Sequence, residues 1–181
     1  MYEFLVLGKL CAGPMHGYMI ARIIGNIMGP FRRVQWGTLY PVLNRLEAEG
    51  LICAVDDTDR DGRARKVYAI TEAGKRRLHE LLMDTEQHLG EYDTLFPHKV
   101  TLFSVLTAQE RLYLGRHYAV YAQQNIDHLL RKRRDILAND HLDSQQKDNI
   151  ASVMDHRIEY WEHECAWAEE LISQQTAREA V

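Results

Sequence analysis

Near the N-terminus, hydrophobic side chains recur every three or four positions, which is the period of an amphipathic α-helix. We predict one helix from Tyr2 to Ala12 and a second from Gly17 to Met28. Gly-Pro pairs at 13–14 and 29–30 should end them, because glycine suits a helix cap and proline lacks the amide N–H. Tyr18 is expected to pack beneath the second helix.

A third helix is predicted from about Gly37 to Gly50, where glycine is a natural C-terminal cap. Its leucines fall at i, i+4 and i+7 and should form one buried stripe, made of Leu39, Leu43 and Leu46. Asn44 then lies on the opposite face with Arg45 beside it, and Thr38 and Tyr40 lie on the two flanks.

After Gly50 the pattern changes to the short apolar runs and alternation of β-strands. Leu51 to Val55 and Arg65 to Ile70 predict two strands, which a polar, aspartate-rich turn joins into a β-hairpin. Thr71 then caps a fourth helix. This order of elements is that of a winged helix-turn-helix, so residues 1–80 are predicted to form a mainly α domain with a small β-hairpin wing.

Residues 81–181 are predicted to form a second domain of several helices, helical from Glu72 onward. Thr107 and Glu110 form a capping box that opens a helix reaching to about residue 138. Asp143 and Gln146 open a last helix, which reaches to about residue 175.

The last helix carries apolar residues with alternating spacings of three and four, an a/d seam that favours packing along another helix. We predict that this seam forms a homodimer, through Ala151, Met154, Ile158, Trp161, Cys165, Ala168 and Ile172. The alternative is an intrachain hairpin with the helix at 107–138, and the two arrangements are compatible.

The composition is that of an ordinary globular protein, with 181 residues of which 46% are hydrophobic and 27% charged. We expect a cytoplasmic protein with no membrane partner, because no apolar run is long enough to span a bilayer and the N-terminus lacks a secretory signal pattern. Three widely separated cysteines predict reduced thiols.

The net charge of −4 is unevenly distributed along the chain. Residues 1–80 carry twelve basic and nine acidic side chains, a net charge of +3. Residues 81–181 carry ten basic and seventeen acidic side chains, a net charge of −7. This asymmetry indicates that the first domain is the one that faces a polyanion.

The basic residues flank the predicted third helix, which in a helix-turn-helix is the recognition helix that enters the major groove of double-stranded DNA. Asparagine and arginine match adenine and guanine edges there, and cations of the wing suit phosphates. The predicted DNA contacts are Arg32, Arg33, Gln35, Trp36, Thr38, Tyr40, Asn44, Arg45, Arg63, Arg65 and Lys66. The alternative for the wing cations is neutralisation of the aspartates in the turn.

Three segments have a distinctive sequence: LVLG at 5–8 with MHGY at 15–18, GTLYPVLNRLEAEGLI at 37–52, and GRARKVYAITEAGK at 62–75. Together they resemble the PadR-like transcriptional regulators. The resemblance implies a homodimeric winged-helix repressor, released from its operator by a small molecule in some members. The helical remainder is similar to the dimerisation domain of the longer subfamily.

A ligand between the helices of the second domain would alter the separation of two recognition helices in a dimer. The candidates for binding a small aromatic or drug-like effector are Tyr92, Tyr118, Tyr121 and Trp167, with Met154 and Trp161. Core packing is the alternative for all of these side chains.

No motif indicates an enzyme, because the chain has no Gly-rich phosphate loop, nucleophile elbow or HExxH sequence. His156, His163 and Cys165 share a helix, but without the i, i+4 spacing of a helical zinc pair. We expect no catalysis, no metal and no cofactor. The alternative to a DNA-binding regulator is an effector-sensing or protein-interaction module without a direct role on DNA.

Overall fold

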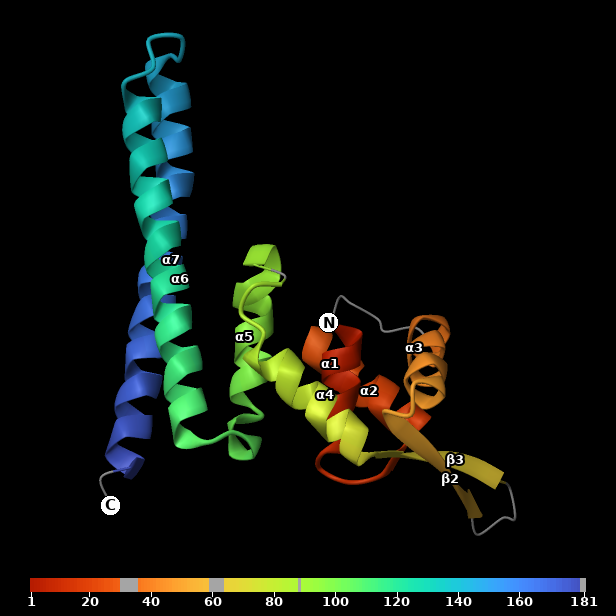
Figure 1. The fold of residues 1–181 in the computed structure, drawn as a ribbon. Helices are drawn as coiled ribbons and strands as arrows, with labels where there is room; N and C mark the ends of the chain where they lie inside the picture. Colours follow the sequence, from red (N-terminus) through yellow and green to blue (C-terminus); the bar gives the residue numbers. More distant parts are fainter. Residues whose placement is uncertain (30–35, 59–63, 88, 180–181) are drawn as a thin grey trace. The chain divides into compact units, whose positions relative to one another are not determined.

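The computed structural model describes residues 1–29, 36–58, 64–87 and 89–179, and it divides the chain into two compact units, Met1–Val105 and Leu106–Val181. The first unit, red to green in Figure 1, contains α1 (Tyr2–Leu10), β1 (Met15–His16), α2 (Gly17–Met28), α3 (Trp36–Ala48), β2 (Ile52–Thr58), β3 (Ala64–Ile70), α4 (Glu72–Met83), η1 (Leu89–Glu91), α5 (Tyr92–Val100) and η2 (Phe103–Val105). This unit extends beyond the boundary predicted at residue 80.

The predicted order of three helices, a β-hairpin and a fourth helix is confirmed, and it defines a winged helix-turn-helix. Strands β2 and β3 pair antiparallel, with Ile52 opposite Ile70 and Val55 opposite Val67. The two-residue strand β1 adds to the other side of β3, where Met15 pairs with Tyr68. This third strand was not predicted, because two residues are too few to show an alternating pattern.

Helix α1 is the centre of the first unit's core. Its apolar residues cover almost its whole circumference, and a helix of that kind is stable only when it is buried. Accordingly Phe4, Leu5, Val6, Leu7 and Leu10 are all buried, and α2, α3, α4 and β3 contact the helix. The helix ends at Leu10, short of the predicted Ala12.

The start of α4 is tied to the end of α3. Thr71 caps α4, accepting a hydrogen bond from the Gly74 amide at 3.0 Å and donating from its hydroxyl to the Gly50 carbonyl at 2.7 Å. A Cβ atom at Gly74 would lie 2.0 Å from the Leu51 carbonyl oxygen, so only glycine permits this approach. The wing therefore leaves α3 and enters α4 within one tightly packed junction.

The prediction of continuous helix from Glu72 onward is wrong at residues 84–91. The Asp84 side chain accepts hydrogen bonds from the amides of Glu86 and Gln87, both at 3.0 Å, and this turn competes with the helix. Helix α5 then packs back on α4 through Lys99, which is fully buried. Its ammonium donates to the carbonyl oxygens of Leu82 and Asp84, at the C-terminal end of α4 where the helix dipole favours a cation.

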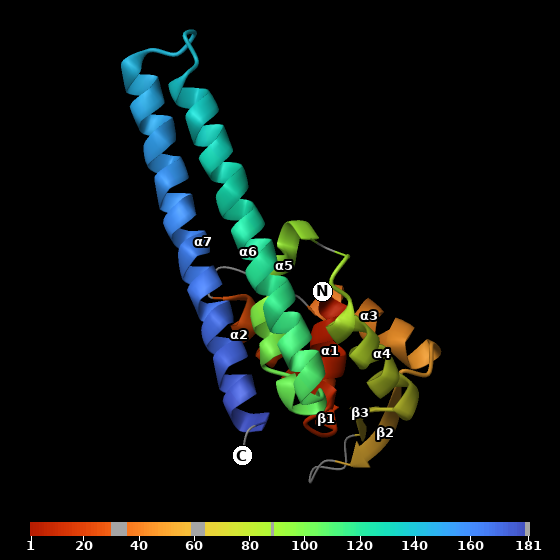
Figure 2. The same ribbon diagram turned by 60° about the vertical axis from the view of Figure 1, so that its left-hand side comes forward.

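The second unit is an antiparallel hairpin of two long helices, α6 (Ala108–Leu137) and α7 (Ser144–Glu179), which lie side by side in both views (Figures 1 and 2). Both predicted caps are confirmed: Thr107 and Glu110 form a capping box, and Asp143 exchanges hydrogen bonds with Gln146. Near the turn, Arg133 binds Asp155 through two contacts of 2.6 and 3.1 Å.

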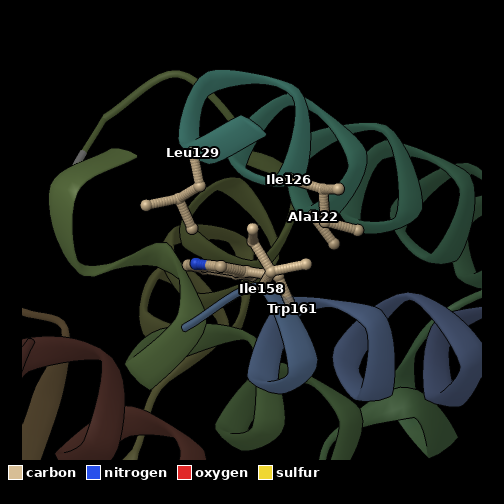
Figure 3. Close-up of a cluster of buried hydrophobic side chains, with 5 residues drawn as sticks. All are labelled: Ala122, Ile126, Leu129, Ile158 and Trp161. Atoms are coloured by element: carbon tan, nitrogen blue, oxygen red, sulfur yellow. The ribbon is translucent and has the colours of Figure 1, made fainter. Parts of the chain in front are cut away.

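The predicted seam of α7 faces α6 of the same chain. Figure 3 shows Ile158 and Trp161 of α7 meeting three apolar residues of α6, namely Ala122, Ile126 and Leu129. Ala151 and Ala168 of the seam are buried as well. The intrachain alternative is therefore the arrangement found within one chain, and a role of the seam in a dimer stays a prediction.

We predict that Lys99→Met removes a pH-dependent part of the first unit's stability. Burial lowers the pKa of Lys99 from 10.5 to about 8, so between these values the unfolded chain binds a proton that the folded chain has lost. The free energy of unfolding of the wild type should therefore rise across this window, by at most about 3 kcal/mol. In Lys99→Met the rise should be missing, as measured by urea denaturation followed by circular dichroism.

The matched control is Lys132→Met, because Lys132 is exposed on α6. Its stability should follow the pH dependence of the wild type. Equal pH dependence in Lys99→Met and the wild type would contradict the assignment.

Candidate nucleic-acid interface

Helix α3 has the predicted division between a core face and a solvent face. Leu39, Leu43 and Leu46 each have 0% exposure, which confirms the predicted stripe. Thr38, Asn44 and Arg45 are exposed, and Tyr40 is 46% exposed although it is a large aromatic residue. The leucines thus hold the helix so that its hydrogen-bonding side chains face outward.

Arg45 does not project alone into solvent. One guanidinium nitrogen lies 2.9 Å from the carboxylate of Glu3 on α1, and the other lies 3.5 Å from Glu49. The second oxygen of Glu3 accepts from Arg77 of α4 at 2.8 Å. Glu3 therefore connects α1 to both α3 and α4, and the guanidinium of Arg45 is held on one flank of α3.

The pKa of Glu3 reflects this position. Burial raises the pKa, but the hydrogen bonds and positive charges of Arg77 and Arg45 outweigh burial and lower it below 4.5. The carboxylate is therefore ionised at neutral pH, as a bridge between two arginines requires.

A second ion pair links α3 to the wing, by which we mean β2, β3 and the turn between them. The Lys66 ammonium on β3 lies 3.3 Å from the Glu47 carboxylate on α3, and this hydrogen bond raises the pKa of Lys66. The lysine side chain is still 55% exposed. The base of the wing is thus fixed to α3 while its cation remains accessible.

Several predicted DNA contacts fall outside the residues that the structure describes: Arg32, Arg33, Gln35 and Arg63. For Trp36 and Arg65 the description covers the backbone alone, at the start of α3 and within β3. Their roles stay predictions. The residues of this set that the structure does bring together on one side of the unit are those of α3 and Lys66.

The interpretation of Tyr18 as a packing residue is wrong, because this side chain is 52% exposed and stacks on His16, with ring centroids 5.6 Å apart. Tyr68 is the buried tyrosine of the wing, and burial raises its pKa. The sequence analysis also missed Glu3, Arg77 and Glu47. Their partners are 42, 74 and 19 residues away in the chain, so no local pattern could have shown them.

Three of the predicted ligand residues cluster in the second unit. Tyr118 stacks on Tyr121 and meets Trp167 edge to face, with ring centroids 6.0 Å apart in each pair, and its hydroxyl donates to Glu164. Tyr118 is fully buried there, as a core residue would be. Tyr92 belongs to the first unit, where it packs on Phe96 beneath the Lys99 ammonium. These four residues are therefore not one cluster within a single unit.

Over the described part of the chain, no group of three or more His, Cys, Asp or Glu side chains is placed to hold a metal ion. Over the same residues, no helix is both long and apolar enough to cross a bilayer.

A winged helix-turn-helix with an exposed polar face on its third helix is the architecture of a DNA-binding domain. Residues 6–80 match the model of the transcriptional regulator PadR-like family. The chain belongs to this family through its N-terminal domain.

Two relatives illustrate the range of similarity. The negative transcriptional regulator PadR of Bacillus subtilis is 28% identical over 108 residues, which cover 60% of this chain and 59% of that protein. The transcriptional regulator Rv3488 of Mycobacterium tuberculosis is 54% identical over 48 residues, which cover 26% of this chain and 44% of that protein. The chain thus matches less than two thirds of the length of either relative.

Solved structures of B. subtilis PadR also align with this chain. The complex with operator DNA has a TM-score of 0.45 at 22% identity and covers 96% of this chain and 98% of that one. The complex with p-coumaric acid has a TM-score of 0.40 at 22% identity, over 96% of this chain and 94% of that one.

We predict that Glu3→Gln destabilises the first unit by about 1–2 kcal/mol at neutral pH, because two charge-assisted hydrogen bonds lose their acceptor charge. Since the folded state lowers the pKa of Glu3, its contribution is present above about pH 4.5 and is lost as the pH falls through the folded pKa. The difference between variant and wild type should accordingly disappear in acid. Hydrogen exchange of the amides in α1 and α4 measures it.

Glu49→Gln is the matched control, because Glu49 pairs with the same Arg45 at the longer distance of 3.5 Å and is itself 45% exposed. It should change stability by less than about 0.5 kcal/mol. A loss in this control as large as that in Glu3→Gln would show that the bridge between the three helices has no special weight.

Proposed function

We propose that this protein is a transcriptional regulator that binds operator DNA as a homodimer and acts as a repressor. The observation that carries the proposal is the exposed hydrogen-bonding face of α3, held outward by three fully buried leucines beside a basic wing. It occurs in a domain whose sequence belongs to a family of transcriptional regulators.

In this proposal α3 enters the major groove. Asn44 is placed to pair with an adenine edge, and Thr38 and Tyr40 flank it. Lys66, with Arg63 and Arg65, contacts phosphates from the wing. Arg45 is already held by Glu3, so it meets DNA from a fixed position on the flank of the helix.

The dimer is assigned to the second unit. The seam residues Ile158, Trp161 and Ala168 are buried within one chain, so additional surface has to meet the partner. Outward apolar side chains exist on both helices: Val153 and Tyr160, seven residues apart on α7, are 61% and 44% exposed, and Val120 on α6 is 57% exposed. Exposed apolar residues at heptad spacing suit a second helix.

Repression and small-molecule control are proposed from the relatives. The B. subtilis relative is named a negative regulator, and a crystal structure of it contains p-coumaric acid. For this chain we propose a small-molecule effector, no catalytic activity, and a cytoplasmic site of action on DNA. An effector that binds differently to the DNA-bound and released states would shift DNA affinity by a coupling of about 1–3 kcal/mol.

Neutralising the wing by Arg63→Ala, Arg65→Ala and Lys66→Ala together should weaken binding to all duplex sequences. Each lost phosphate contact should reduce the slope of log affinity against log salt by about 1. Fluorescence anisotropy with a duplex at several salt concentrations measures both quantities.

The control removes the same charge from α6, by Arg131→Ala, Lys132→Ala and Arg134→Ala, which are all exposed. This variant should keep the affinity and the salt slope of the wild type. An unchanged affinity in the wing variant would favour a protein-interaction module without a direct role on DNA.

A footprint on the DNA upstream of the protein's own gene should show two half-sites related by a pseudo-palindrome. Because a dimer presents two recognition helices, the centres of the half-sites should lie about 34 Å apart, or a multiple of that distance. Protection of a single, non-symmetric half-site would contradict the dimeric mode of binding.

A further inference from the structure

A pocket in the first unit is used neither by the recognition helix nor by the wing. It lies between α1, the last turn of α2 and the end of α5, with about 340 Å³ of empty space. This volume is within the range of small-molecule sites. Its walls are mainly apolar and include Phe4, Leu5, Ile27 and Leu102.

Two side chains give this pocket a positive polar end. Lys9 on α1 and His98 on α5 both line it, and no aspartate or glutamate does. Lys9 is half-buried, and its ammonium forms no ion pair with any residue that the structure describes. A half-buried cation of this kind gains most from an anionic partner, because it has already lost part of its hydration.

His98 adds a neutral donor to this cation. Burial, and then the charge of Lys9, lower the pKa of His98 below 6.5, so the imidazole is neutral at physiological pH. The nearby Thr101 hydroxyl is already used, because it donates to the His98 carbonyl at 2.8 Å. The polar end therefore offers one full positive charge together with the imidazole.

We propose that this pocket binds a small carboxylate with an apolar body of about the size of benzoate. The carboxylate pairs with the Lys9 ammonium and accepts from His98, and the ring packs on Phe4, Leu5 and Ile27. A dianionic phosphate fits less well, because one cation among apolar walls cannot compensate two negative charges. A cationic ligand would meet Lys9 without a counter-charge.

The position of the pocket gives its occupancy a route to the recognition helix. Ile27 lies in the last turn of α2, directly before the segment that leads to α3. A ligand that packs on Ile27 would bias how α2 ends against α1 and α5. This consequence rests on the proposed DNA-binding function, whereas the binding site itself does not.

The site is not contained in the family match. The matched segment ends at residue 80, and His98, Thr101 and Leu102 lie beyond it. The α5 wall of the pocket therefore belongs to this chain's own continuation of the domain.

The test titrates the full chain, without DNA, with benzoate and with its neutral isostere benzamide, using isothermal calorimetry or ligand-observed NMR. Benzoate should bind with a Kd of about 0.1–1 mM, and at least tenfold more tightly than benzamide. Lys9→Met should weaken benzoate at least tenfold and leave benzamide unchanged. Lys9→Arg, which keeps the charge, should retain the affinity for benzoate within a few-fold.

Lys132→Met is the matched control, because it removes a lysine from the exposed surface of α6. It should bind benzoate as the wild type does. Equal affinity for benzoate in Lys9→Met and wild type would overturn the proposal, as would equal affinity of the wild type for benzoate and benzamide. Absence of benzoate binding up to about 10 mM would also overturn it.

Because the titration contains no DNA, its failure would leave the DNA-binding proposal intact. Conversely, a wing variant that keeps its DNA affinity would refute the DNA contacts without affecting the benzoate site. The two proposals are therefore tested separately.

Discussion

The burial of Leu39, Leu43 and Leu46 against the core that α1 organises is the constraint on which the first unit depends. Three fully buried leucines in one stripe fix the rotation of α3 about its own axis, because any other rotation would expose them to water. That rotation decides which side chains of α3 reach solvent. The position of the wing follows as well, since the junction at Gly50, Thr71 and Gly74 begins where α3 ends.

Ion pairs supplement this apolar constraint and act on position more than on total stability. Glu3 is largely buried and holds Arg45 and Arg77, so the three helices that carry these residues keep their relative arrangement. Glu47 does the same between α3 and β3. Exposed pairs of this kind contribute little free energy each, but they restrict the orientation of long side chains at the surface that would face DNA.

Periodic patterns made most of the fold predictable from sequence, because the helices and the β-hairpin each bury one face and repeat accordingly. The buried stripe of α3 and both caps of the long helices belong to this local class of information. Strand β1, the break after α4 and the partner of the α7 seam depend on distant contacts and were missed or left open. For the same reason Asn44 could be placed on the exposed face, whereas the pairing of Arg45 with Glu3 could not be seen.

The short connection between α6 and α7 bears on how the protein folds. Residues 138–143 are all that separates the two helices, so the first contacts across the seam close a very small loop. The entropy lost in closing it is correspondingly low, and topologies dominated by such near contacts form quickly. The first unit instead has to join residues as distant as Glu3 and Arg77. The hairpin can therefore assemble early and serve as a folded platform while the slower unit searches for its native contacts.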